Sequence, residues 1–149
     1  MNNLNLKNTT EQLIDTFLEA GKIAKEISQR GVKVTIKSDK SPVTDGDLAV
    51  DKILTLKIKN LTPSIPVISE ETVNLNTQSK DRTFWLIDPI DGTHDYIHDK
   101  DEFTINAALI INNRPEIGII YAPAKKRLFY SYEKNLSFEL INNKEKKLD

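Results

Sequence analysis

The stretch "FWLIDPIDGT", residues 84–93, decides how this chain folds. It opens with four apolar residues, as a buried strand does, and then places two aspartates three positions apart. We expect Pro89 to end the strand after Asp88, and Gly92 to let the backbone turn tightly beyond Asp91. Carboxylates at a buried edge are costly unless a positive charge lies between them. The stretch therefore predicts a strand that ends at a cation.

Two amphipathic helices are predicted before this strand. Thr9 and Gln12 have the spacing of a capping box, and apolar residues recur after them at helical intervals until Gly31, where we expect the first helix to end. A second helix follows a loop, with Thr44 or Asp45 as its cap and two prolines beyond its end.

Short apolar runs separated by turn residues predict a sheet. Residues 32–37 alternate apolar and polar side chains, as a half-buried strand does. The other expected strands are residues 67–69, 84–87, 102–111, 116–122, 127–132 and 137–141, whereas residues 143–149 look like a solvated tail. Two helices on a largely antiparallel sheet make a layered α+β fold, and no helix is predicted to cover the second face of the sheet.

Composition limits the function classes. The 149 residues suit one domain, and the formal net charge of −1 gives no general attraction to nucleic acid. The chain has no cysteine, which excludes disulfides and thiolate chemistry. We see neither a signal peptide nor an apolar run that could span a bilayer. The expected location is the cytoplasm, either free or peripheral at the inner face of the membrane.

Carboxylates follow two of the predicted strands. Glu70 and Glu71 come after residues 67–69, and Asp88 and Asp91 come after the apolar run of the opening stretch. If these strands are neighbours, the carboxylates leave the sheet at the same edge, and the carbonyl of Ile90 can turn towards them. Such an all-oxygen cluster suits hard cations such as Mg²⁺.

Polar residues on either side of this cluster suggest a reaction. Two cations shared by the carboxylates would serve phosphoryl transfer to water. Thr93 is placed to orient the attacking water together with Asp47, which lies at the start of the second helix. The competing interpretation is a solvated loop, which fits the two glutamates better than the two aspartates. His94 and His98 have the spacing of a zinc-protease helix, but without a third ligand we expect surface histidines in a loop.

Four motifs in order resemble the inositol monophosphatase superfamily of Mg²⁺-dependent, lithium-sensitive phosphatases: "SPVTDGD", "ISEET", "WLIDPIDGTHDYI" and "EFTINAALI" with "EIGIIYAP". Within it the chain is most similar to the bacterial 3′(2′),5′-bisphosphate nucleotidases, the CysQ group. The resemblance runs from the first helix to about Tyr130. It implies the sugar-phosphatase type of α+β layered sandwich.

The resemblance also implies roles for individual residues. Two or three Mg²⁺ ions would be held by Glu70, Asp88, the Ile90 carbonyl and Asp91, with Glu71 at a weaker position; Asp47 and Thr93 would activate the attacking water; and Gly92, Thr93 and His94 would contact the substrate. The implied substrate is a small phosphorylated molecule, 3′-phosphoadenosine 5′-phosphate, hydrolysed to AMP and phosphate. An inositol phosphate or another sugar phosphate stays open as the alternative.

Family members carry a second domain after the strands near Tyr130. It contains a Gly-Ser-rich segment and a Trp-Asp-x-Ala-Ala-Gly sequence that complete the site, and neither string occurs here. We therefore expect residues 1–149 to form the N-terminal metal-binding domain alone. This leaves two possibilities: a chain that works with a complementing C-terminal chain or by self-association, and a truncated, inactive fragment that only binds metal.

Overall fold

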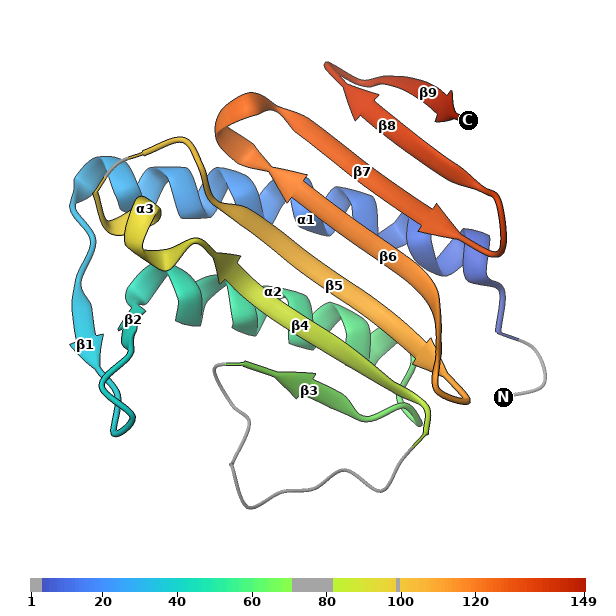
Figure 1. Ribbon diagram of the computed structural model, residues 1–149, viewed down its shortest axis with the longest axis horizontal. Coiled ribbons are helices and arrows are strands. Elements are labelled where there is room, and N and C mark those ends of the chain that lie inside the picture. Colours follow the sequence, from blue (N-terminus) through green and yellow to red (C-terminus); the bar gives the residue numbers. More distant parts are fainter. Residues whose placement is uncertain (1–3, 71–81, 99) are drawn as a thin grey trace.

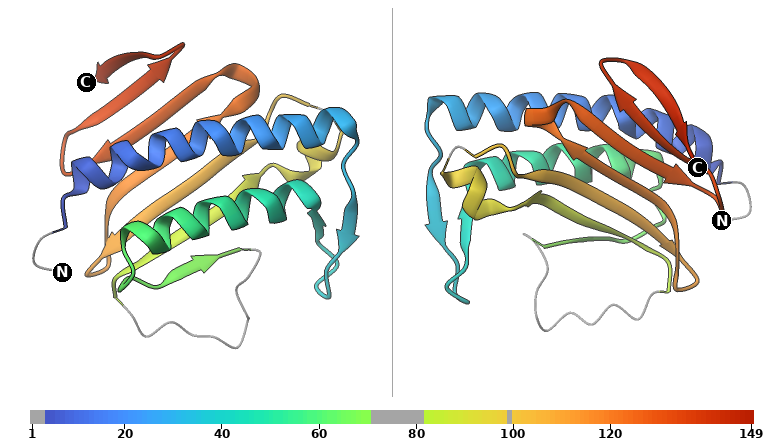
Figure 2. Two further views of the ribbon diagram at one scale, coloured as in Figure 1. Left: turned by 180° about the vertical axis from the view of Figure 1, so that it is seen from behind. Right: turned by 45° about the horizontal axis from the view of Figure 1, so that its top comes forward.

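The computed structural model describes residues 4–70, 82–98 and 100–149. The two long helices, α1 (Leu6–Arg30) and α2 (Asp45–Leu61), lie side by side on one face of a seven-stranded sheet (Figures 1 and 2). The predicted layered α+β fold is confirmed. Within the described part, no helix is long and apolar enough to cross a membrane.

The sheet is almost entirely antiparallel. Its order follows the sequence, namely β3 (Val67–Ser69), β4 (Phe84–Asp91), β5 (Thr104–Ile111), β6 (Arg114–Ala122), β7 (Arg127–Tyr132), β8 (Ser137–Ile141) and β9 (Lys144–Leu148). Only the pairing of β3 with β4 is parallel within this sheet. Two short helical segments, α3 (Thr93–Ile97) and η1 (Pro123–Lys125), follow β4 and β6.

Two predictions about strands are wrong. The expected tail is strand β9, which pairs with β8 across a turn where Asn142 and Asn143 both have positive φ angles (49° and 63°). The side chains of β9 are mostly charged and do not alternate with apolar ones. The strand is therefore defined by its backbone pairing with β8. The segment expected to be half-buried forms β1 (Val34–Ile36), whose three residues are all exposed, paired with β2 (Pro42–Thr44) in a separate hairpin.

The helix ends agree with the prediction at three of four places. Gly31 caps the end of α1 with φ 104°, Thr44 caps α2, and α2 ends before the two prolines. The expected start of α1 at Thr9 is wrong. The capping residue is Asn5, four positions earlier, whose side chain accepts the N–H of Asn8 at 2.9 Å.

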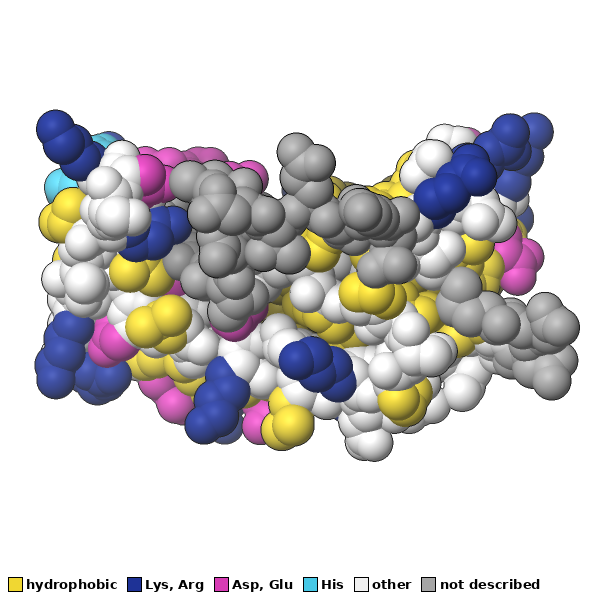
Figure 3. Space-filling view, turned by 90° about the horizontal axis from the view of Figure 1, so that it is seen from below, with side chains coloured by type: hydrophobic (Ala, Val, Ile, Leu, Met, Phe, Trp, Pro, Cys, Tyr) yellow, Lys and Arg dark blue, Asp and Glu magenta, His cyan; other side chains and the backbone are white. Residues whose placement is uncertain are grey.

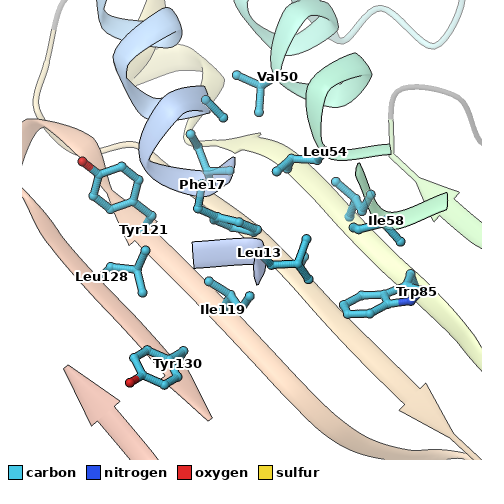
Figure 4. Packing of buried hydrophobic residues seen from close by; sticks show 14 of the residues in the cluster. Leu13, Phe17, Val50, Leu54, Ile58, Trp85, Ile119, Tyr121, Leu128 and Tyr130 are labelled. Atoms are coloured by element: carbon cyan, nitrogen blue, oxygen red, sulfur yellow. The ribbon is translucent and has the colours of Figure 1, made fainter. Parts of the chain in front are cut away.

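The main core lies between the helices and the sheet. Figure 4 shows Leu13 and Phe17 of α1 and Leu54 of α2 pointing towards Trp85 and Ile119 of the sheet, and all five side chains are fully buried. The Trp85 indole N–H also donates a hydrogen bond to the Thr62 hydroxyl at 3.0 Å. This contact fixes the end of α2 against β4.

The opposite face of the sheet has no helix on it in the part of the chain that the structure describes. Leu86 and Ile120 alternate along β4 and β6 with residues buried against the helices, so they lie on that face, and they are 48% and 47% exposed. On the same face the half-exposed Arg127 pairs with the buried Glu139, with Nε to Oε1 at 2.7 Å.

The two faces of α2 give a prediction about stability. Leu54→Ala should lower the free energy of unfolding by about 3 kcal/mol, because it empties a fully buried position in the core. Leu56→Ala on the same helix is the control, since Leu56 is 71% exposed and its loss should cost less than about 0.5 kcal/mol. Urea unfolding followed by circular dichroism measures both. Equal losses would contradict this packing.

Candidate active site

The carboxylate cluster begins where β3 and β4 pair. Ser69 is opposite Ile87 in the parallel register, and the Glu70 N–H donates to the Ile87 carbonyl at 3.1 Å. Glu70 therefore follows β3 directly beside Asp88. The prediction that these two strands are neighbours is confirmed. Glu71 lies outside the described residues.

The end of β4 differs from the prediction. The strand does not stop at Pro89 but continues to Asp91, and its register with β5 shifts between Asp88 and Asp91. Proline has no N–H for the ladder, so an irregular step in the strand accommodates it. Gly92 then turns the chain with φ 91°, and a Cβ there would lie 3.0 Å from the Glu102 carbonyl. The predicted requirement for glycine at this turn is confirmed.

Asp47 is held at the start of α2 by a capping box. Its Oδ2 accepts the Thr44 N–H at 2.9 Å and the Thr44 hydroxyl at 2.5 Å, and the side chain is fully buried. The Thr93 hydroxyl lies 3.4 Å from the other carboxylate oxygen of Asp47 and 3.2 Å from the Ile90 carbonyl oxygen. The Thr93 hydroxyl group therefore lies near two other residues of the predicted site, Asp47 and Ile90.

Negative charge accumulates around Asp88. Burial, a hydrogen bond with Glu70 and the charges of Glu70, Asp91 and Asp47 raise the pKa of Asp88 to about 8. Burial also raises the pKa of Asp47, although its hydrogen bonds from Thr44 and Thr93 act in the opposite direction. Among the described residues, the Oδ1 atom of Asp88 is a buried acceptor with no partner. The raised pKa of Asp88 and its unpartnered oxygen both indicate that no positive charge lies beside this carboxylate.

The donors around Asp88 bear on whether a divalent cation can be held here. Within the described ranges, no group of three carboxylates or imidazoles lies close enough to enclose a metal ion. Mg²⁺ in phosphate-processing sites is commonly held by one or two carboxylates, with waters and substrate oxygens completing its shell. The unpartnered Asp88 oxygen, the mutual repulsion of its neighbours and the all-oxygen donor set fit that kind of site.

The helix α3 orients Thr93 through a residue that the sequence reasoning missed. Tyr96 is buried, and its hydroxyl donates to the Ala24 carbonyl of α1 at 2.7 Å. Its ring lies against Gly46, where a Cβ would collide with it. Tyr96 thus joins α3 to both long helices. Two features of the sequence could have indicated this role of Tyr96. It follows Thr93 by three residues, and a glycine, Gly46, stands directly before Asp47.

His94 lies on the outside of α3. Its side chain is 77% exposed, and its ring stacks on that of His98 with centroids 4.3 Å apart. The histidines are on the surface as predicted, but His94 belongs to a short helix rather than a loop, and His98 caps its end. Figure 3 shows acidic side chains gathered beside the histidines at this end of the molecule.

The chain matches the family model described as the inositol monophosphatase family over residues 5–145. This match spans nearly all of its length. The protein therefore belongs to the inositol monophosphatase family.

Individual relatives point to one group within the family. A 3′(2′),5′-bisphosphate nucleotidase CysQ from Aggregatibacter actinomycetemcomitans is 35% identical over 83% of this chain and 46% of its own length. The corresponding protein from Salmonella typhimurium is 41% identical over 65% of this chain and 40% of its own length. The chain spans about half the length of the curated relatives that it matches.

Solved structures share the fold. CysQ from Bacteroides thetaiotaomicron superimposes with a TM-score of 0.75 at 32% identity, covering 94% of this chain and 51% of that one. The IMPase of Thermotoga maritima gives a TM-score of 0.76 at 26% identity, covering 90% and 51%. This chain therefore has the same fold as about half of each of these two structures.

Asp88 gives a prediction for stability against pH in a chelating buffer. Its pKa is raised from 3.8 to about 8 on folding. Between these values the folded state holds a proton that the unfolded state has lost, so stability falls as pH rises. Asp88→Asn should therefore raise Tm by roughly 2–5 °C at pH 8.5 and leave it nearly unchanged at pH 4.

The matched control is Asp15→Asn, which neutralises an exposed aspartate on α1. Its Tm should follow that of the unmodified chain at both pH values, as measured by thermal unfolding under circular dichroism. A lower Tm of Asp88→Asn at pH 8.5 would contradict the repulsion described here.

Proposed function

We propose that this chain carries the catalytic face of a magnesium-dependent phosphatase that hydrolyses 3′-phosphoadenosine 5′-phosphate to AMP and phosphate. The observation that supports it is the buried, unpartnered oxygen of Asp88 among acidic neighbours, close to the pair of Asp47 and Thr93. A cation would neutralise this cluster, and a hydroxyl group lies where a water can be oriented. Location in the cytoplasm belongs to the same proposal.

Each residue has a defined part in the proposed reaction. Two or three divalent cations shared among Glu70, Asp88, Asp91 and the Ile90 carbonyl, with Glu71 at a weaker position, would supply positive charge that offsets the charge of the phosphate and favours ionisation of a water; waters and substrate oxygens would complete their shells. The Thr93 hydroxyl is placed to donate to Asp47 while its oxygen accepts a hydrogen bond from the attacking water.

The substrate would lie over the turn after β4. Backbone N–H groups at the start of a helix lack partners within the helix, so those of Gly92 and Thr93 are available to phosphate oxygens. His94 is exposed beside them and is assigned to the substrate contact. Water attacks phosphorus, the bond between phosphorus and the ester oxygen breaks, and the alcohol leaves with a proton.

The nucleotide is favoured over an inositol phosphate by the relatives. The matching curated relatives with 34–41% identity carry the name bisphosphate nucleotidase, whereas the Thermotoga maritima IMPase structure is 26% identical. We also propose that residues 1–149 correspond to the metal-binding half of such an enzyme. A complementing chain, or a second copy, would then pack on the sheet face that bears Leu86 and Ile120.

Metal binding and turnover are tested separately. In the unmodified chain, Mg²⁺ should raise Tm by a few degrees, because binding to the folded state alone stabilises it. Phosphate release from 3′-phosphoadenosine 5′-phosphate should exceed that from inositol 1-phosphate. Thr93→Ala should lower turnover by about 100-fold while the Mg²⁺-dependent shift in Tm remains.

The same assays decide between the alternatives. Asp88→Asn should remove the Tm shift and the turnover together, and Asp15→Asn should retain both. A shift in Tm without phosphate release, alone or with a complementing C-terminal chain, would support a fragment that only binds metal. The absence of any Mg²⁺-dependent shift would overturn the proposal.

A further inference from the structure

A cavity of about 400 Å³ lies between α1 and two turns of the sheet. In Figure 1 the turn from β6 to β7 and the turn from β8 to β9 both lie along the same edge of α1. The cavity is lined by Leu18, Gly21, Lys22, Lys25, Tyr121, Pro123, Lys126, Leu140, Asn142 and Asn143. It shares none of these residues with the candidate active site.

Three cationic side chains line this cavity, and no carboxylate does. Lys22 and Lys25 are three residues apart, so they are neighbours on one face of α1. Lys126 reaches the cavity from the turn after η1. Within the described part of the chain none of the three has an ion-pair partner, whereas the adjacent Lys125 pairs with Glu102 at 3.4 Å. Like charges that face one space repel each other, which an anion between them would relieve.

A hydroxyl group adds to the donors of the cavity. The missing side chain of Gly21 lets the Tyr121 ring lie against α1, since a Cβ there would collide with it. Figure 4 shows the Tyr121 hydroxyl pointing away from Phe17 and Leu13, and among the described residues it makes no hydrogen bond. Burial raises the pKa of Tyr121, which keeps the hydroxyl protonated and able to donate.

The remaining walls are of two kinds. Leu18, Pro123 and Leu140 provide apolar surface, and the amide side chains of Asn142 and Asn143 stand at the turn between β8 and β9. The volume falls within the roughly 300–1,000 Å³ that small-molecule sites occupy. A cationic rim over an apolar wall matches a ligand that joins a multiply charged group to an apolar ring.

We propose that this cavity binds a small organic phosphate, with the phosphate groups between Lys22, Lys25 and Lys126 and an apolar ring against Leu18, Pro123 and Leu140. Phosphate oxygens accept charge-assisted hydrogen bonds from ammonium groups, which are the strongest of the contacts available here. The site is separate from the carboxylate cluster, so it stands or falls independently of the phosphatase activity proposed above.

The test uses adenosine 5′-diphosphate and inorganic pyrophosphate as probes, measured by isothermal titration calorimetry with a chelator present. Without metal, the carboxylates at β3 and β4 repel both anions, so binding reports the lysine cavity. We expect adenosine 5′-diphosphate to bind more tightly than pyrophosphate, because only the former fills the apolar wall. Equal affinities would overturn the assignment of that wall.

Variants locate the binding. Replacing Lys22, Lys25 and Lys126 together by Gln should weaken adenosine 5′-diphosphate at least about tenfold. Tyr121→Phe should weaken it by about threefold without changing the charge. The matched control replaces three exposed lysines outside the cavity, Lys7, Lys52 and Lys134, by Gln and should bind as the unmodified chain does.

Three results would overturn the proposal. One is the absence of binding by the unmodified chain. Another is an equal loss in both triple variants, which would show attraction to general surface charge. The third is binding of a tetraglutamate peptide as tightly as adenosine 5′-diphosphate, which would assign the cavity to acidic peptides. Circular dichroism of each variant confirms that the fold is retained.

Discussion

The parallel pairing of β3 with β4 is the contact on which the candidate site depends. Its register places Glu70 beside Asp88, and that register is fixed by burial on the helix side. Trp85 and Ile87 are buried, and Leu86 between them is exposed. A slip by one residue would turn the two buried side chains away from the helices, at a large cost in apolar burial. The core therefore sets the spacing of the carboxylates.

A second constraint brings the two long helices to the same place. The capping box at Thr44 and Asp47 uses the start of α2 as part of the site, and Tyr96 connects the following segment to α1. Neither contact is a catalytic one. The capping box holds Asp47, and the Tyr96 contact holds the helix α3 that begins with Thr93. The positions of Thr93 and Asp47 relative to each other are therefore set by how the helices pack.

Much of this arrangement was predictable from the sequence because the signals are local. The apolar run before Asp88, the cap at Thr44 and the glycine at Gly92 each act within a few residues. The start of α1 was mistaken because Thr9 imitates a capping residue while Asn5, closer to the terminus, does the capping. Strand β9 was missed because its side chains carry no apolar pattern, and the link from Tyr96 to Ala24 joins residues 72 apart, which no local pattern reveals. The roles of the site residues stay predictions.

The order of the strands has a consequence for how the molecule forms. From β4 to β9 every strand pairs with its successor in the sequence, so these pairings close short loops and can form early. The first helix, in contrast, packs on β6 and β7, and Tyr96 must find Ala24 across 72 residues of the chain. We therefore expect the sheet to assemble before α1 docks on it. During synthesis α1 is therefore made well before β6 and β7, the strands on which it packs.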